Sequence, residues 1–345
     1  MNRVVKYDIL RIVASFSIVL LHVSASYWSV VDIYGSEFLV MTIYNSLTRF
    51  AVPVFFMLSG LFLNAPDRKN DALGKRILKI IVLFYIWSAF YAFQGIAIDT
   101  LSGNFSMEVF RASIERFIFG HVHMWFLQML CGFYILIPIA RQLCQKKEAV
   151  QYYLFVWVLF KFLIPCLTES LHFETIQARI DSLGLDILVG NFGYFLLGYY
   201  LNLIDIRKKV RDVIYVMGLA AVGLTAVLTV WNCKETGAYV ERWFSPASLN
   251  VLIMTVAIFI FFKYSKLFES VKKPYVWKKL AHYSFFIYMF HMFVIEKLNL
   301  IGITTVSFPA IISIPVLTIF TFGISLLAAF VVDHISILRK LLMLH

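Results

Sequence analysis

The stretch YDILRIVASFSIVLLHVSASYW, residues 7–28, decides the fold of this chain. It is long enough to cross the hydrocarbon core of a bilayer as a helix, yet it contains Asp8, Arg11 and His22. Ionisable side chains inside a membrane helix are costly, and they usually face the interior of a helix bundle or a water-filled cavity. The stretch therefore predicts a membrane protein whose first helix carries a functional polar face.

Four polar residues share that face, because Asp8, Arg11, Ser15 and His22 follow one another at helical spacing. Arg11 and His22 lie three turns apart, roughly 16 Å along the helix axis. The alternative for Asp8 and Arg11 is a charge pair at the membrane surface, with the arginine snorkelling to the interface. The alternative for His22 is a hydrogen-bonded packing histidine.

The composition extends this reading to the whole chain. Of its 345 residues 61% are hydrophobic and 15% are charged, and the mean hydropathy is +0.82. Soluble domains have about half apolar and a quarter charged residues. We therefore predict an all-α polytopic membrane protein that forms a single integral-membrane domain over residues 1–345. The first stretch is too long for the apolar region of a cleavable signal peptide.

Hydrophobic runs of spanning length predict a bundle of about ten transmembrane helices. We place them at 7–28, 38–63, 76–97, 122–140, 150–167, 187–204, 212–231, 247–263, 280–298 and 310–333.

Basic residues collect in the loops on one side of these spans. They are Arg3, Lys6, Arg68, Lys69, Lys75, Arg76, Lys79, Arg141, Lys146, Lys147, Arg207, Lys208, Lys209, Arg211, those of the run 263–279, Arg339 and Lys340. The positive-inside rule then places both termini in the cytoplasm, as an even number of spans requires. This distribution explains the net charge of +11, and it argues against nucleic-acid binding.

The second span carries Arg49 near its middle, where a lone cation calls for an anionic partner or ligand. Pro53 and the pair Ser59-Gly60 can bend this helix and free backbone groups. The alternative for Ser59-Gly60 is close helix packing through small residues.

The third and fourth spans begin with further polar residues. Arg76 and Lys79 lie one turn apart at the cytoplasmic end of the third span. They form either a phosphate-binding site or positive-inside anchors. His121 and His123 are expected at the outer surface of the membrane. Trp125 follows them, and it suits a functional residue and an interfacial anchor equally well. Two histidines two residues apart do not share a helix face, and the four cysteines lack metal-ligand spacing. No metal site is therefore predicted.

The ninth span contains Ser284, Tyr288 and His291 at intervals of four and three residues, on one helix face. His291 is expected near the middle of the membrane. A second intramembrane histidine with a tyrosine one turn away favours a functional site over coincidence.

These residues, taken in order, resemble the membrane-bound acyltransferase-3 family over essentially the whole chain. The matching positions are Arg11 and His22; Pro53, Phe55, Phe56, Ser59 and Gly60; Arg76, Lys79 and Ile80; His123, Trp125, Phe126 and Leu127; Tyr194 to Tyr199; and Ser284, Ile287, Tyr288 and His291. Leu61 departs from the family pattern, which has an aromatic residue there, and Phe285-Phe286 replace a small residue and a glycine. The chain is similar to the short, stand-alone sugar O-acetyltransferases of the family, of the kind that acts on enterobacterial common antigen.

The resemblance implies transfer of an acyl group, usually acetyl, from cytoplasmic acyl-CoA to a hydroxyl of a cell-envelope glycan or lipid-linked sugar, in the bacterial inner membrane. Acetyl-CoA would be a substrate, and no permanently bound cofactor is expected. Within that reaction we assign donor binding to Arg11, Ser15, Arg76 and Lys79, catalysis to His22, Arg49, Tyr288 and His291, and acceptor binding to Ser59, His123 and Trp125.

Within this reading, His22 is either the general base or a transiently acylated relay. Arg49 or Tyr288 suits the developing oxyanion, and His291 is a second acid/base or positioning group. The alternative function is a transporter or flippase for a small polar or lipid-linked sugar substrate, because polar residues strung across a bundle suit that role too. A purely structural membrane protein would leave His22, Arg49 and His291 unexplained. The sequence carries no indication of the oligomeric state.

Overall fold

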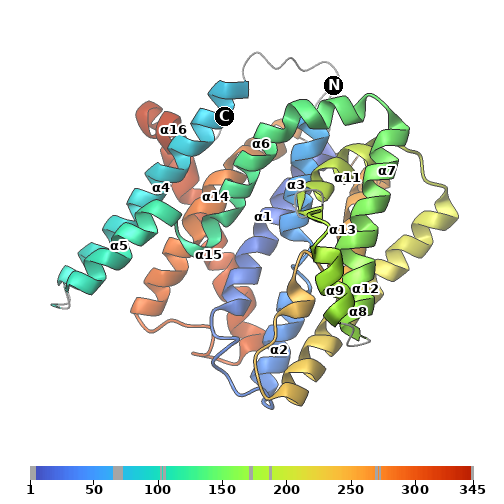
Figure 1. Ribbon diagram of the computed structural model, residues 1–345. Coiled ribbons are helices and arrows are strands. Elements are labelled where there is room, and N and C mark those ends of the chain that lie inside the picture. Colours follow the sequence, from blue (N-terminus) through green and yellow to red (C-terminus); the bar gives the residue numbers. More distant parts are fainter. Residues whose placement is uncertain are drawn as a thin grey trace. The chain divides into compact units, whose positions relative to one another are not determined.

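The computed structural model describes residues 5–64, 73–101, 103, 106–170, 174–185, 189–268, 271 and 273–342, and every regular element within these ranges is a helix (Figure 1). The basic residues Arg3, Arg68 and Lys69, part of the run 263–279 and the start of the predicted span 187–204 lie outside the described residues.

The chain divides into two compact units. The first unit comprises residues 1–68, 137–281 and 304–319, and the second comprises residues 69–136, 282–303 and 320–345. The elements are α1 (Val5–Ala25), α2 (Ser36–Ser46), α3 (Ala51–Leu63), α4 (Leu73–Leu101), α5 (Met107–Phe119), η1 (Val122–Met124), α6 (Trp125–Cys144), α7 (Lys147–Val158), η2 (Leu159–Leu163), α8 (Ile164–Ser170), α9 (Glu174–Asp181), α11 (Phe192–Leu203), α12 (Lys208–Thr236), η3 (Arg242–Phe244), α13 (Leu249–Tyr264), η4 (Lys266–Phe268), α14 (Pro274–Leu300), α15 (Ala310–His334) and α16 (Ser336–Leu342).

Eight helical segments among the described residues are long and apolar enough to cross a membrane. They coincide with all the predicted spans except 187–204 and 280–298. In the first of these two regions the described helix is α11, with 12 residues; the second lies within α14, which has 27 residues. The protein is thus an all-helical, multi-pass membrane protein.

The second span is interrupted rather than bent. Helices α2 and α3 are separated by a turn over residues 47–50, which contains Arg49. The cause is Pro53, since proline has no backbone N–H to donate to the carbonyl four residues earlier, and its ring clashes with that carbonyl. The carbonyl in question belongs to Arg49. The predicted disturbance of this helix by Pro53 is confirmed, and it places Arg49 in a turn.

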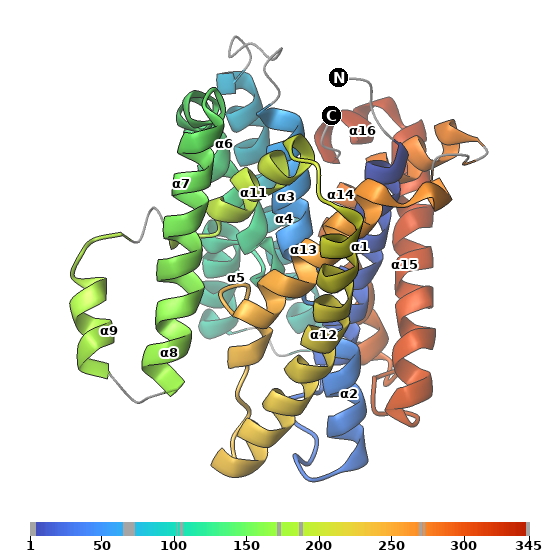
Figure 2. The ribbon, with the colours of Figure 1, turned by 90° about the vertical axis from the view of Figure 1, so that its right-hand side faces the viewer.

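Within the first unit, α3 and α11 pack at very short range through glycines (Figure 2). A Cβ atom built on Gly60 would lie 1.7 Å from the carbonyl oxygen of Phe195, and one on Gly198 would lie 2.1 Å from that of Met57. Because neither position has room for a methyl group, only glycine permits this approach. Close packing, the alternative raised for the Ser59-Gly60 pair, therefore holds at Gly60.

In the second unit, α4 packs against α5, α16 and the part of α14 that begins at His282. The rings of Phe90 and Phe293 lie 5.2 Å apart. The Tyr91 hydroxyl donates to the carbonyl of Met289 at 2.6 Å. Aromatic contacts thus run along the α4–α14 contact and bring the polar residues of both helices together.

We predict that Gly60→Ala destabilises the protein, whereas Gly223→Ala in α12 does not, because nothing lies within 4 Å of a Cβ at Gly223. Overpacking of this kind costs about 1–3 kcal/mol, and alanine is otherwise the better helix former. Thermal unfolding of the purified variants in detergent measures both effects. Equal melting temperatures for the two variants would contradict the packing at Gly60.

Candidate active site

The predicted polar face of α1 lies in the first unit. Asp8 and Ser15 are 3% and 2% exposed, and Arg11 and His22 are half-buried. The Arg11 guanidinium lies 5.8 Å from the centre of the Phe62 ring. The Ser15 hydroxyl has no hydrogen-bond partner among the described residues. A buried hydroxyl normally finds a partner, so this position suits contact with a bound molecule or water.

Arg49 meets an aromatic ring in the first unit. Its guanidinium lies 4.0 Å from the centre of the Phe244 ring in η3, a distance typical of a cation–π contact. Glu241, just before η3, also acts on it electrostatically, and the Arg49 Nε atom has no hydrogen-bond partner in the described part of the chain. The ring face and the nearby carboxylate together answer the expectation of a partner for this cation.

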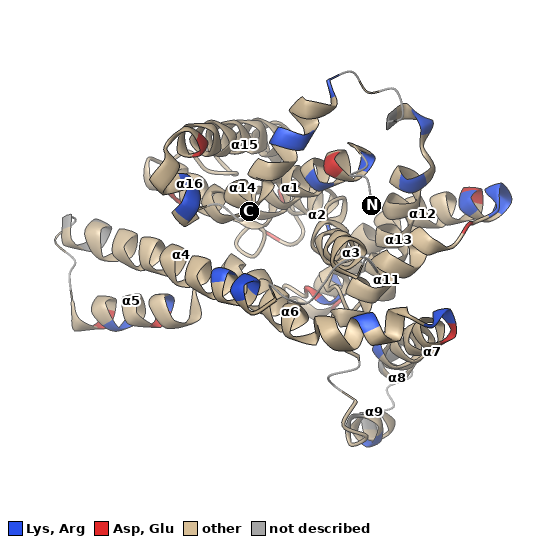
Figure 3. Cartoon of the chain, turned by 90° about the horizontal axis from the view of Figure 1, so that it is seen from above, with Lys and Arg blue, Asp and Glu red and all other residues tan. Residues whose placement is uncertain are grey.

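Ser59, predicted to contact the acceptor, donates its hydroxyl to the carbonyl of Phe55 in its own helix at 2.8 Å. Serine often forms this bond to the carbonyl four residues earlier. In the second unit, Arg76 and Lys79 are half-buried in the first turns of α4. In Figure 3 the ribbon of α4 is blue, the colour of lysine and arginine, near this end of the helix.

The second unit brings together three of the predicted site residues. His123, Tyr288 and His291 are 1%, 6% and 0% exposed. The ring of His123 lies 5.5 Å from that of Tyr288 and 5.4 Å from that of His291. The Tyr288 hydroxyl donates to the carbonyl of His123. A buried group of two imidazoles and a phenol thus joins η1 to α14.

The expectation that His121 and His123 point to different faces of a helix was wrong. Their Nδ1 atoms are 2.8 Å apart, and His123 is buried, whereas Trp125 is 39% exposed. The spacing argument assumed an α-helix, but His121 has extended backbone angles and precedes the short 3₁₀ turn η1. In that local geometry the two side chains turn toward each other.

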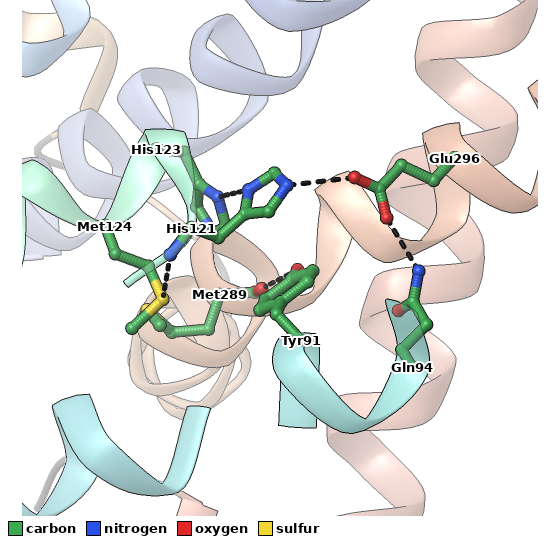
Figure 4. A network of polar contacts seen from close by, with 7 residues as sticks. All are labelled: Tyr91, Gln94, His121, His123, Met124, Met289 and Glu296. Atoms are coloured by element: carbon green, nitrogen blue, oxygen red, sulfur yellow. Dashed lines mark hydrogen bonds and ion pairs between the residues drawn. The ribbon is translucent and has the colours of Figure 1, made fainter. Parts of the chain in front are cut away.

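The structure adds residues that the sequence reasoning did not select (Figure 4). The Nε2 atom of His121 lies 2.9 Å from the Glu296 carboxylate, which also accepts a hydrogen bond of 2.7 Å from Gln94. The ring of Tyr91 stacks on that of His121 at 4.5 Å. The available signal was Glu296 itself, an acidic residue one and a half turns beyond His291 on the same predicted helix. Among the described residues, no group of three or more His, Cys, Asp or Glu side chains could hold a metal ion.

Residues 4–330 match a family model described as an acyltransferase domain. The chain belongs to the acyltransferase-3 family. It is therefore a membrane acyltransferase, which transfers groups other than aminoacyl groups, and the family suggests a glycan or similar acceptor. No curated protein and no solved structure matches the chain.

We predict that Tyr288→Phe lowers the stability of this acyltransferase by about 1 kcal/mol, the net value of a typical hydrogen bond, because it leaves the carbonyl of His123 without the phenol donor. The matched control is Tyr275→Phe, since Tyr275 is 70% exposed and lies before the predicted span 280–298, so its hydroxyl can bond to water in the folded and in the unfolded state. Thermal unfolding compares the two. An effect at Tyr275 as large as that at Tyr288 would contradict the assigned role of the Tyr288 hydroxyl.

Proposed function

We propose that this membrane acyltransferase moves an acetyl group from cytoplasmic acetyl-CoA to a hydroxyl of a cell-envelope glycan or lipid-linked sugar. The observation that carries the proposal is the buried cluster of His123, Tyr288 and His291 in a chain of the acyltransferase-3 family. Imidazole is the side chain best suited to exchange protons with a hydroxyl near neutral pH. The resemblance to the sugar O-acetyltransferases of the family supports acetyl as the transferred group.

The reaction requires a base or nucleophile and a group that stabilises the oxyanion. We assign the first role to His22 on α1, either as general base on the acceptor hydroxyl or as an acylated relay. Arg49 or Tyr288 serves the oxyanion, and His291 is the second acid/base or positioning group. Support for Arg49 comes from its turn position, where its Nε atom has no hydrogen-bond partner among the described residues.

The donor carries phosphate groups and a long, thin pantetheine arm. Arginine and lysine are the usual partners of phosphate, so we assign Arg11 and, on α4, Arg76 and Lys79 to donor binding. Ser15 follows Arg11 by one turn and offers its buried hydroxyl to the donor. Along α1 the distance from Arg11 to His22, roughly 16 Å, suits a thin arm.

The acceptor is assigned to His123, Trp125 and Ser59. His123 is buried and Trp125 is partly exposed, so the histidine suits a hydroxyl within the site, and the indole face suits stacking on a sugar ring. The Ser59 hydroxyl donates its proton to the carbonyl of Phe55, so in this scheme the lone pairs of its oxygen accept a hydrogen bond from the acceptor.

The proposal includes a topology of about ten spans with both termini in the cytoplasm of a bacterial inner membrane. The charge distribution in the loops supports it. A transporter or flippase is the alternative in another functional class, and the family match does not favour it.

We predict that His22→Ala abolishes transfer of label from acetyl-CoA to envelope glycans, because it removes the assigned base or nucleophile. The control is His334→Ala, an exposed histidine at the end of α15, which should keep normal activity. Mass spectrometry of the glycan distinguishes an acetyl from a succinyl increment. Full activity of His22→Ala would refute the role of His22; substrate flux into liposomes without labelled product would instead favour transport.

We also predict that Arg11→Ala raises the KM for acetyl-CoA by tenfold or more and leaves the acceptor KM unchanged. The magnitude follows from about 1.5–3 kcal/mol for a hydrogen bond to a charged group. Arg207→Ala removes an exposed arginine at the start of α12 and serves as the control. Steady-state kinetics with each substrate varied in turn measures the effect, and an unchanged donor KM would remove Arg11 from the donor site.

A further inference from the structure

The polar contacts around His121 form a chain with a defined direction. Glu296 lies at one end, with a side chain that is 33% exposed, and the His121 side chain beside it is 11% exposed. His121 links the carboxylate to His123 through contacts of 2.9 and 2.8 Å. The Glu296, His121 and His123 side chains, here called the carboxylate–histidine chain, come from α14 and from the segment that leads into α6 (Figure 4).

Hydrogen-bond chemistry fixes the protons along this chain. An ionised carboxylate only accepts hydrogen bonds, so the Nε2 atom of His121 carries the proton that faces Glu296. A neutral imidazole has one N–H and one lone pair, which makes the Nδ1 atom of His121 an acceptor. The Nδ1 atom of His123 must then donate, and the lone pair of His123 resides on its Nε2 atom.

We propose that Glu296, acting through His121, holds His123 in the tautomer whose Nε2 atom accepts a hydrogen bond from the acceptor hydroxyl. This inference rests on the proposed function, because it identifies what His123 does for the acceptor. Glu296 and His121 are positioning residues in this assignment. An accepting nitrogen selects a ligand that donates, so the site favours a free hydroxyl over one that is already acylated.

Neighbouring groups support the direction of the hydrogen bonds in the carboxylate–histidine chain. Gln94 on α4 donates to the second oxygen of Glu296 at 2.7 Å, which leaves the first oxygen to His121. Tyr91 stacks on the His121 ring, Arg116 on α5 acts electrostatically on Glu296, and His291 lies beside His123. Protonation of His121 would make both of its nitrogens donors and reverse the tautomer of His123. The acceptor hydroxyl would then lose its partner.

Two substitutions at position 296 separate orientation from mere contact. Glu296→Lys presents a donor to His121 and should reverse both tautomers, which raises the acceptor KM roughly tenfold for one lost hydrogen bond and leaves the donor KM unchanged. Glu296→Gln keeps a carbonyl oxygen that can accept from His121, and Gln94 can turn its amide to accommodate it, so this variant should retain the wild-type acceptor KM. Glu115→Lys, at an exposed position of α5, makes the same charge change and should leave both constants unchanged.

A second measurement needs neither substrate. Selective ¹⁵N-histidine labelling of the full chain in lipid nanodiscs distinguishes protonated from unprotonated ring nitrogens, with His123→Gln to assign the signal. In the wild type at neutral pH the Nε2 atom of His123 should be unprotonated, and in Glu296→Lys it should carry the proton. A protonated Nε2 in the wild type, or an unchanged acceptor KM in Glu296→Lys, would overturn the proposal. Failure of the wild type to acylate any hydroxyl would refute the proposed function alone, because the tautomer is read independently.

Discussion

A polar side chain among apolar helices has to find its hydrogen-bond partner within the protein, and both units are shaped by this requirement. In the second unit a single carboxylate satisfies it for two neighbours. Glu296 accepts hydrogen bonds from Gln94 and from His121, and so ties α4 and the segment before α6 to α14. Removing this carboxylate would leave the donors of both Gln94 and His121 without their acceptor.

The first unit depends on a steric constraint within one short segment. Pro53 stops the helix that would otherwise continue through Arg49, and Gly60, two turns later, lets α3 approach the backbone of α11. The same segment therefore separates α2 from α3 and packs α3 against α11. The break places a guanidinium in a turn, where the ring of Phe244 lies 4.0 Å away. Outside the two helices, the Arg49 guanidinium is stabilised mainly by the Phe244 ring and by the charge of Glu241.

Hydropathy predicted eight of the spans because length and apolar content alone determine which segments can cross a bilayer. It could not predict that α11 has only 12 residues, because apolar content does not determine where a helix begins or ends. The buried group of His123, Tyr288 and His291 was within reach, because two of its members lie on one helical face. The pairing of His121 with His123 was not, because the spacing rule presumes α-helical geometry that this turn lacks. Glu296 precedes Lys297 at the end of a predicted span, where a charge is usually assigned to the interface.

Membership of the acyltransferase-3 family establishes the class of reaction. The geometry adds the direction of the hydrogen bonds from Glu296 through His121 to His123. A histidine cluster alone is ambiguous, since each neutral ring can donate from either nitrogen. An ionised carboxylate removes that ambiguity because it has no proton to give, and the amide of Gln94 removes the carboxylate's own choice of partner by occupying its second oxygen. The orientation set at a partly exposed residue is thereby carried to a buried one through His121. An imidazole that must accept a hydrogen bond from a hydroxyl needs a group such as this carboxylate to fix its tautomer. Without one, the tautomer of a buried imidazole is set by whichever partner lies nearest.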